Sequence, residues 1–374
     1  MRVLIFMCGE GLGHTSRCIS VGRQLISAGN EVFFGAYGYS HQLVEKSGYS
    51  VHEIPSEIKL VGRKGYLDML ASVGATLKSA KLSGGKVVLD LIDEVKPDVV
   101  LSDSYYLGIL GAKVKGIPVV IMVNQTNMVD FFRDRGTSLN ILGKLAKTFY
   151  SAVFEQVDGI IVPDFPPPYT VCRRNLSFTK GMLDKIVFSG PIVRRRYGEV
   201  KAKKLAKPHV LSMVGGFGYR ACLFENILAA AKLDRTIDYT LVSGPSVDAA
   251  QFGRPHGNVG IESFIEDPFP YIKGSDVVIA PGGHSGCMES MSFGKPLLSF
   301  PDMLHNEQEN NATVVDEEGY GRRLSYFTPP QVILTCIREV LDDKSYVRKT
   351  ARLRRLSAEL DGPSRVVEIL EDAA

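Results

Sequence analysis

A glycine-rich break in the second half of the chain has the composition of an anion-binding turn. An apolar strand is expected over Val277–Ala280, and after a Pro-Gly-Gly break the chain restarts as a helix near Ser285. Backbone N–H groups at the start of a helix have no partner within it, and the helix dipole favours a negative charge there. The residues offered to a phosphate are Gly283, His284, Ser285 and Gly286. The competing interpretation is a tight turn that binds nothing.

Three polar residues near this turn suit the rest of a nucleotide diphosphate carrying a polar group. Glu289 lies one turn into the helix and is its only carboxylate, in reach of a ribose. A second strand is expected over Pro296–Phe300, followed by a polar loop that contains Glu307 and Gln308. Ligands of open α/β sheets bind at the carboxyl ends of the strands, where this loop lies.

A histidine in the first half of the chain is a candidate general base. His14 follows the first strand, in a turn that also contains Gly11 and Gly13. Imidazole accepts a proton near neutral pH, as transfer to a hydroxyl requires. Asp103 ends another strand at the same edge, so we expect it to hydrogen-bond His14 and orient the ring. The alternative role for a lone loop histidine is a polar cap.

Further residues at the strand ends are candidates for substrate contacts. Asn124 and Gln125 end a strand on the same edge as His14 and are expected to contact an acceptor, and Arg133 is expected to meet an acceptor phosphate. In the second half, Gly215, Gly216 and Phe217 follow a strand and offer backbone N–H groups to the diphosphate, with Arg220 adding charge. A turn without a ligand is again the alternative. No Asp-x-Asp motif follows a strand, and we expect no bound metal.

The elements that must position these residues form two similar halves. Short β-branched runs alternate with helical patterns throughout, which is typical of doubly wound parallel sheets. Each half opens with a strand, a glycine turn and a helix. We expect a domain over residues 1–190, a basic linker over 191–208, a second domain over 209–350 and a final helix, 351–374, that packs back toward the first domain.

Composition restricts the class of protein. A chain of 374 residues is long enough for two domains, and a net charge of +3 gives no sign of a nucleic-acid partner. The six cysteines show no metal-binding spacing and indicate reduced thiols. No apolar run reaches about 18 residues, and the chain starts with a strand pattern instead of a leader. These features predict a cytoplasmic protein.

The stretch Ala280–Ala312 resembles the donor-binding signature of GT-B nucleotide-sugar glycosyltransferases, the group that includes MurG and the UDP-glycosyltransferases. The resemblance implies two Rossmann-like domains facing across a cleft, with Gly282–Gly286 on the diphosphate, Glu289 on the ribose, and Glu307 with Gln308 on the sugar. It also implies His14 as the base with Asp103 as its partner, and backbone contacts of Phe264 and Ile265 to the nucleotide base. Phe264 and Ile265 suit a core position equally well. The proline that often follows the Gly-His pair in this group is absent here.

The resulting expectation is an inverting, metal-independent enzyme that moves a hexose or N-acetylhexosamine from a UDP-sugar, its co-substrate, to a hydroxyl. The acceptor is expected to be lipid-linked or a cell-surface glycan precursor. The segment 128–154 mixes apolar residues with cations, which fits either peripheral membrane contact or a half-buried helix. Two other functions stay open: a non-hydrolysing UDP-N-acetylglucosamine 2-epimerase and a non-catalytic nucleotide-sugar-binding protein.

Overall fold

The computed structural model describes residues 1–9, 12–57, 59, 61–63, 66–79, 84–127, 137–214, 220–244, 252 and 257–374. Within them, a seven-stranded parallel sheet has the order β3-β2-β1-β6-β7-β8-β9. Its strands are β1 (Arg2–Met7), β2 (Glu31–Ala36), β3 (Val51–Glu53), β6 (Val99–Asp103), β7 (Val119–Met122), β8 (Gly159–Val162) and β9 (Ile186–Phe188). The central strands are buried along almost their whole length, as the continuous apolar runs predict. We call this sheet with its helices the first lobe.

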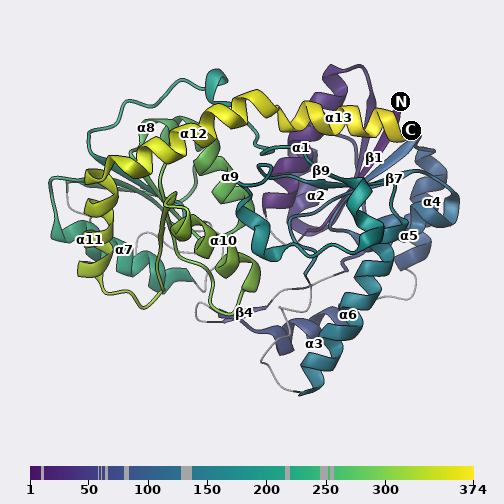
Figure 1. The fold of residues 1–374 in the computed structure, drawn as a ribbon, viewed down its shortest axis with the longest axis horizontal. Coiled ribbons are helices and arrows are strands. Elements are labelled where there is room, and N and C mark those ends of the chain that lie inside the picture. The colour runs from purple at the N-terminus through teal and green to yellow at the C-terminus, as the bar shows by residue number, and fades with distance from the viewer. Residues whose placement is uncertain are drawn as a thin grey trace.

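A second parallel sheet of six strands has the order β12-β11-β10-β13-β14-β15 among the described residues. Its strands are β10 (His209–Ser212), β11 (Asp238–Val242), β12 (Val259–Glu262), β13 (Val277–Ala280), β14 (Leu297–Ser299) and β15 (Gly321–Arg323). This sheet with its helices is the second lobe. The two lobes lie side by side in Figure 1, with α9 (His284–Ser292) and α10 (Asn306–Glu317) between the sheets. The expectation of two Rossmann-like units is confirmed.

Helices connect the strands and cover the sheets. In the first lobe they are α1 (Leu12–Ser27), α2 (Gly38–Lys46), α3 (Met69–Ser79), α4 (Gly84–Val95), α5 (Tyr106–Lys115) and α6 (Thr137–Gln156), with a small β4–β5 hairpin (Gly62–Arg63, Tyr66–Leu67). In the second they are α7 (Ala221–Leu233), α8 (Phe269–Gly274), α9, α10 and α11 (Pro330–Asp342). Short 3-10 helices cover Val171–Asn175 (η2), Lys180–Lys185 (η3) and Tyr197–Glu199 (η4).

The end of the chain crosses from one lobe to the other. Helix α12 (Lys344–Leu360) packs against α9, whereas α13 (Gly362–Ala373) packs against α1 and strands β6 to β8. Figure 1 shows the two helices in yellow, running along one side of both lobes. The domain boundaries given above stay a prediction.

Two expectations about elements are wrong. Glu307 and Gln308 lie in the first turn of helix α10 and not in a loop, because buried polar side chains replace the apolar stripe that marks most helices. The last helical pattern is two helices, broken at Asp361, which has a left-handed backbone (φ 44°) and is followed by glycine and proline.

Candidate active site

The first sheet gathers His14, Asp103 and Asn124 at one edge. Strands β1, β6 and β7 are neighbours, and Met7 pairs with Asp103 in register. His14 lies in the first turn of α1, directly after β1, and Asn124 follows β7. Parallel strands therefore place the three side chains together, as their positions at strand ends predict.

His14 and Asp103 are in direct contact, and Arg17 completes the group. The His14 Nδ1 atom lies 2.8 Å from Asp103 Oδ1. The Arg17 guanidinium donates to both Asp103 oxygens, from Nε at 2.6 Å and from Nη2 at 2.5 Å. Burial alone would raise the pKa of Asp103, but the charges and hydrogen bonds of Arg17 and His14 hold that pKa far below its usual value. Asp103 is therefore a carboxylate at any physiological pH.

This geometry fixes the tautomer of His14. A carboxylate only accepts hydrogen bonds, so His14 Nδ1 must carry the proton that it shares with Asp103. Arg17 Nη2 also lies 3.0 Å from His14 Nδ1, and since both atoms are donors, its proton goes to Asp103. In the neutral ring the lone pair is therefore on the other nitrogen, Nε2, which has no hydrogen-bond partner in the described part of the chain. A general base needs such a free lone pair. The His14 side chain is also 23% exposed and is therefore not sealed inside the lobe.

Sequence reasoning missed Arg17. Its side chain is 4% exposed, and its guanidinium donates hydrogen bonds to Asp103 and Asn124 inside the first lobe. The available signal was its spacing: three residues after His14, it lies on the same helix face.

The glycine turn Gly282–Gly286, which we call the donor turn after its predicted role, leads directly into a helix, as predicted. Helix α9 begins at His284, with Gly283 as its N-cap and with no side-chain cap on its first N–H groups. A Cβ atom on Gly282 would lie 2.4 Å from the Gln308 carbonyl oxygen, so only glycine lets α10 lie this close to the turn. The N-terminus of α9 thus keeps the features of an anion site.

The candidate base and the donor turn lie close together where the two lobes are in contact. A Cβ atom on Gly13 would lie 2.4 Å from Ser285 Oγ, and helices α1 and α9 are in contact. His14 follows Gly13 in the chain, so the candidate base is next to the start of α9. The prediction that His14 and the glycine turn face each other across the lobes agrees with this arrangement.

The His284 side chain joins the second lobe to the first. Its Nε2 donates to Asp164 Oδ2 at 3.1 Å, and Asp164 also accepts from the Cys172 backbone N–H at 2.8 Å. Burial alone would raise the pKa of Asp164, but the hydrogen bond and charge of His284 lower it. Asp164, Cys172 and His284 are buried, with potential metal-ligand atoms within 4.8 Å of one another. No local sequence pattern predicts this group, because its members are far apart in the chain.

Glu289 lies in the same helix as the donor turn. It is half-buried, and burial raises the pKa of its carboxyl group to about 7, although the charge of Arg194 opposes the shift. Arg194 therefore lies near the predicted ribose contact. Sequence reasoning had assigned it only to a basic linker.

Two predicted donor residues share one carboxylate. Arg220 is buried and donates through Nε to Asp302 Oδ1 at 2.9 Å. Gln308 donates to Asp302 Oδ2 at 3.1 Å and accepts from the Asp302 N–H at 2.9 Å. Asp302, which follows β14, also accepts from the Tyr326 hydroxyl. The arrangement fixes the loop between β14 and α10 close to the donor turn.

For the remaining predicted contact residues, the structure gives only their exposure, or they lie outside the described residues. Phe264 and Ile265 follow β12, and Phe264 is 59% exposed while Ile265 is half-buried. Gln125 is half-buried beside Asn124. The predicted residues Gly11, Arg133, Gly215, Gly216 and Phe217 lie outside the described residues.

Comparison with known proteins matches residues 1–335 to the family described as glycosyl transferase family 1. An uncharacterized glycosyltransferase of Methanosarcina mazei is 59% identical over 374 residues, covering 100% of this chain and 99% of the relative. The UDP-N-acetylglucosamine--N-acetylmuramyl-(pentapeptide) pyrophosphoryl-undecaprenol N-acetylglucosamine transferase of Shewanella amazonensis is 25% identical, covering 100% of this chain and 98% of that one. Among solved structures, the glycotransferase of kitacinnamycin superposes with a TM-score of 0.75 at 20% identity, covering 100% of this chain and 98% of that one.

The fold, the two facing Rossmann-like sheets and the family match agree with one another. The resemblance to GT-B glycosyltransferases is therefore confirmed, and the chain belongs to glycosyl transferase family 1.

Proposed function

We propose that this protein transfers a hexose or N-acetylhexosamine from a UDP-sugar to a hydroxyl group, with inversion and without a metal ion. One observation carries the proposal. The His14 ring, oriented by Asp103 at 2.8 Å, lies beside the N-terminus of α9 where Gly13 meets Ser285.

The chemistry is a single displacement. His14 Nε2 takes the proton of the acceptor hydroxyl while the oxygen attacks the anomeric carbon of the donor sugar. The bond from that carbon to the phosphate oxygen breaks, and UDP leaves with the electron pair. Backbone N–H groups and the dipole at the start of α9 stabilise the charge that grows on the diphosphate. Because one bond forms opposite the bond that breaks, the anomeric configuration inverts.

Residues around the turn have proposed roles in holding the donor. Glu289 binds the ribose, and Glu307 with Gln308 contacts the sugar. The donor class is supported by the Shewanella amazonensis relative, whose name states UDP-N-acetylglucosamine as its donor. That name also specifies an acceptor on pyrophosphoryl-undecaprenol, which supports a lipid-linked acceptor for this chain.

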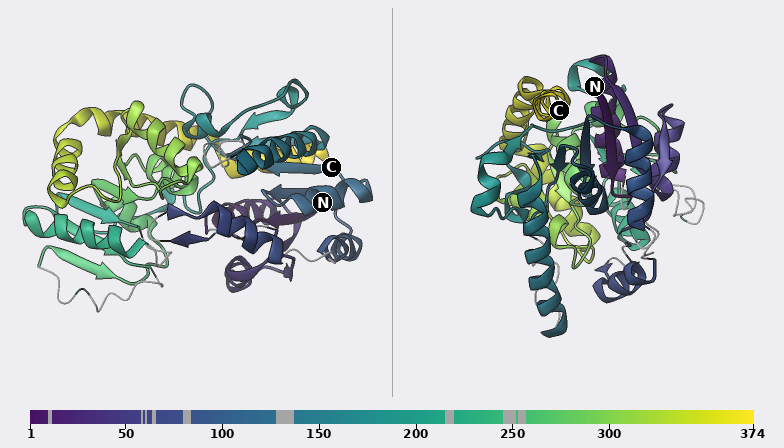
Figure 2. Two further views of the ribbon diagram at one scale, coloured as in Figure 1. Left: turned by 90° about the horizontal axis from the view of Figure 1, so that it is seen from below. Right: turned by 90° about the vertical axis from the view of Figure 1, so that its right-hand side faces the viewer.

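Helix α6 supports an acceptor at a membrane surface. Its C-terminal half packs on the first lobe through Val153 and Phe154. Its N-terminal and middle turns expose four large apolar side chains, Ile141, Leu142, Leu145 and Phe149. Lys144 and Lys147 are exposed between them and have no ion-pair partner among the described residues. Figure 2 shows α6 projecting beyond the body of the molecule in its right-hand view.

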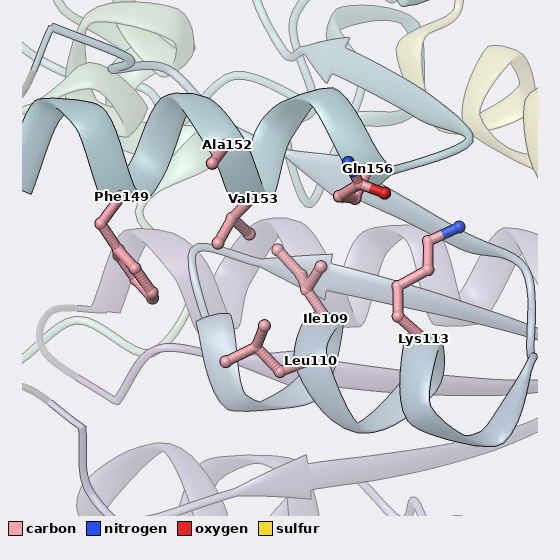
Figure 3. Close-up of a pocket in the computed structure, with 7 residues that line it drawn as sticks. All are labelled: Ile109, Leu110, Lys113, Phe149, Ala152, Val153 and Gln156. Carbon is pink, nitrogen blue, oxygen red and sulfur yellow. The ribbon is translucent and has the colours of Figure 1, made fainter.

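A groove between α5 and α6 continues the apolar surface. Figure 3 shows that Phe149, Ala152, Val153 and Gln156 of α6 face Ile109, Leu110 and Lys113 of α5. Among the helices that the structure describes, none combines the length and apolar composition needed to cross a bilayer. We propose a protein of the cytoplasm that contacts the membrane peripherally through α6.

The decisive experiment replaces the base and keeps the donor site. The His14→Gln variant is expected to lose about 10²- to 10⁴-fold in transfer rate, the usual contribution of a general base. UDP should still raise its unfolding temperature, since ligand at 100 times its dissociation constant adds about 2.7 kcal/mol. The matched control is His41→Gln, because the His41 side chain is also 23% exposed and lies 3.8 Å from a carboxylate, that of Glu53.

The same assay separates the other functions. Conversion of UDP-N-acetylglucosamine to an epimer without any acceptor would identify a 2-epimerase and reject transfer. UDP-sugar binding with no turnover on any hydroxyl acceptor, in wild type and variant alike, would identify a binding protein.

A further inference from the structure

The side chain of Asn124 bridges the two lobes at the level of the candidate base. Its Oδ1 accepts from Arg17 Nη1 at 3.0 Å, within the first lobe. Its Nδ2 donates to Glu307 Oε1 at 3.1 Å, across to helix α10 of the second lobe. Asn124 is 9% exposed, so the amide is largely withdrawn from water.

Chemistry fixes the direction of this amide. Arginine has only donors, so the oxygen of Asn124 must face Arg17, and a carboxylate has only acceptors, so the nitrogen must face Glu307. The amide dipole therefore lies between a cation and an anion. No other residue type of this size supplies an acceptor on one side and a donor on the other.

The bridge is the middle of a longer chain of contacts. On one side, Arg17 holds Asp103, which holds His14. On the other side, Glu307 Oε1 accepts from Asn311 Nδ2 at 2.7 Å, and the same nitrogen lies 3.0 Å from the carbonyl oxygen of Gly282. Hydrogen bonds thus connect the candidate base in one lobe to the first glycine of the donor turn in the other.

The residues in this series of hydrogen bonds are buried, so a shift of one of them displaces its neighbours. Exposed fractions are 4% for Arg17, 0% for Asp103, 9% for Glu307 and 0% for Asn311. Buried charged hydrogen bonds are strong and directional, and a partner that moves away leaves a costly unpaired group. If α10 moves, Glu307 therefore pulls on Asn124, and Asn124 in turn shifts the Arg17 guanidinium that holds Asp103.

We propose that Arg17 and Asn124 are positioning residues that align the base His14 with the donor turn only when the second lobe is docked on the first. The inference rests on the function proposed above. The Asn124–Glu307 hydrogen bond forms when the lobes meet, and through Arg17 it fixes the orientation of the Asp103–His14 pair. Neither Arg17 nor Asn124 is required to touch a substrate.

The experiment replaces the amide nitrogen that donates to Glu307 with a carboxylate oxygen. The Asn124→Asp variant keeps the acceptor for Arg17 but places a carboxylate against Glu307. Its kcat is expected to fall by about tenfold to a hundredfold, the usual effect of losing a hydrogen bond to a charged group. The donor KM should change little, and the unfolding temperature should fall. In a Glu307→Gln background the repulsion is gone, so the same substitution should cost less than about threefold.

This comparison is independent of what Glu307 itself does, because the double variant is compared with the Glu307→Gln single variant. The control for an amide-to-carboxylate change is Gln331→Glu, since Gln331 is exposed at the start of α11, a position that tolerates negative charge. Both kcat and unfolding temperature should match wild type in that control.

Three results would overturn the proposal. An equal cost of Asn124→Asp in both backgrounds would show that the two side chains do not interact. A background-dependent unfolding temperature with an unchanged kcat would show a purely structural bridge. If wild type neither binds nor turns over any UDP-sugar, the proposed function fails by itself, and additivity of the unfolding temperatures then rejects the bridge as well.

Discussion

Single residues at the site differ in how their charges are balanced. Asp103 is fully buried and ionised because Arg17 and His14 surround it. Glu289 has no hydrogen-bond partner in the described part of the chain, and its burial raises the pKa of the carboxyl group to about 7. A carboxyl group kept partly protonated costs stability when it must ionise, so Glu289 fits a residue that serves a ligand more than the fold.

The pH dependence of stability tests this difference. The pKa of Glu289 is about 7 in the folded chain, above the ordinary value of 4.5 that it has in an unfolded one, so the folded state binds the proton more tightly. Stability is therefore lost as the pH rises from about 4.5 toward 7 and beyond. We expect Glu289→Gln to raise the unfolding temperature at pH 8 more than at pH 5. An equal change at both pH values, measured by thermal unfolding without ligand, would contradict the raised pKa.

At the scale of elements, the junction between α12 and α13 determines where the chain changes lobes. Asp361 is the last residue before α13, in a left-handed conformation, and its side chain accepts from Ser364 at the start of that helix. It also forms an ion pair with Arg196 of the linker. One residue thus ends a helix, caps the next and contacts the connection between the lobes.

Substitution of Asp361 separates these roles. Asparagine tolerates the left-handed conformation and caps helices about as well as aspartate, so Asp361→Asn should cost well under 1 kcal/mol. Alanine does neither, and Asp361→Ala should lower the free energy of unfolding by about 1–2 kcal/mol. Urea unfolding of both variants provides the measurement. A loss in Asp361→Asn as large as that in Asp361→Ala would assign the effect to the ion pair with Arg196.

At the scale of the whole molecule, α6 is a helix that leaves several large apolar side chains exposed. We expect the wild-type protein to float with liposomes that contain anionic lipid at low salt and to bind less as salt is added, because lysines contribute by attraction. Replacing Ile141 and Leu145, which are 55% and 64% exposed, with glutamate should abolish flotation. The control is Val332→Glu on α11, where an apolar residue is 45% exposed far along the chain from α6. Absence of wild-type flotation at any salt concentration would refute the membrane contact.

Much of the fold could be predicted from local patterns. The strand expected over Val277–Ala280 has the bounds of β13, and the strand expected over Pro296–Phe300 contains β14, because buried parallel strands are continuous apolar runs. Helix α10 was missed because Glu307, Gln308 and Asn311 occupy its buried face. Hydrophobic periodicity fails where a helix buries polar groups against a partner lobe.

Contacts of the candidate site that lie within one sheet could be predicted, whereas those between the two lobes could not. His14 and Asp103 end elements of one sheet, and sheet topology alone brings them together. The contact of Asn124 with Glu307, in contrast, joins residues 183 positions apart and forms only across the two lobes. No local pattern specifies such a contact.

The place of α13 has a consequence for how the protein is made. Val366, Val367 and Leu370 belong to the same hydrophobic cluster as Val3, Ile5 and Leu101 of the first sheet. A ribosome releases these last residues only after the entire second lobe has been synthesised. Until then the amino-terminal half exposes an apolar face that its own sequence cannot cover. The half that is translated first is consequently the half that is completed last.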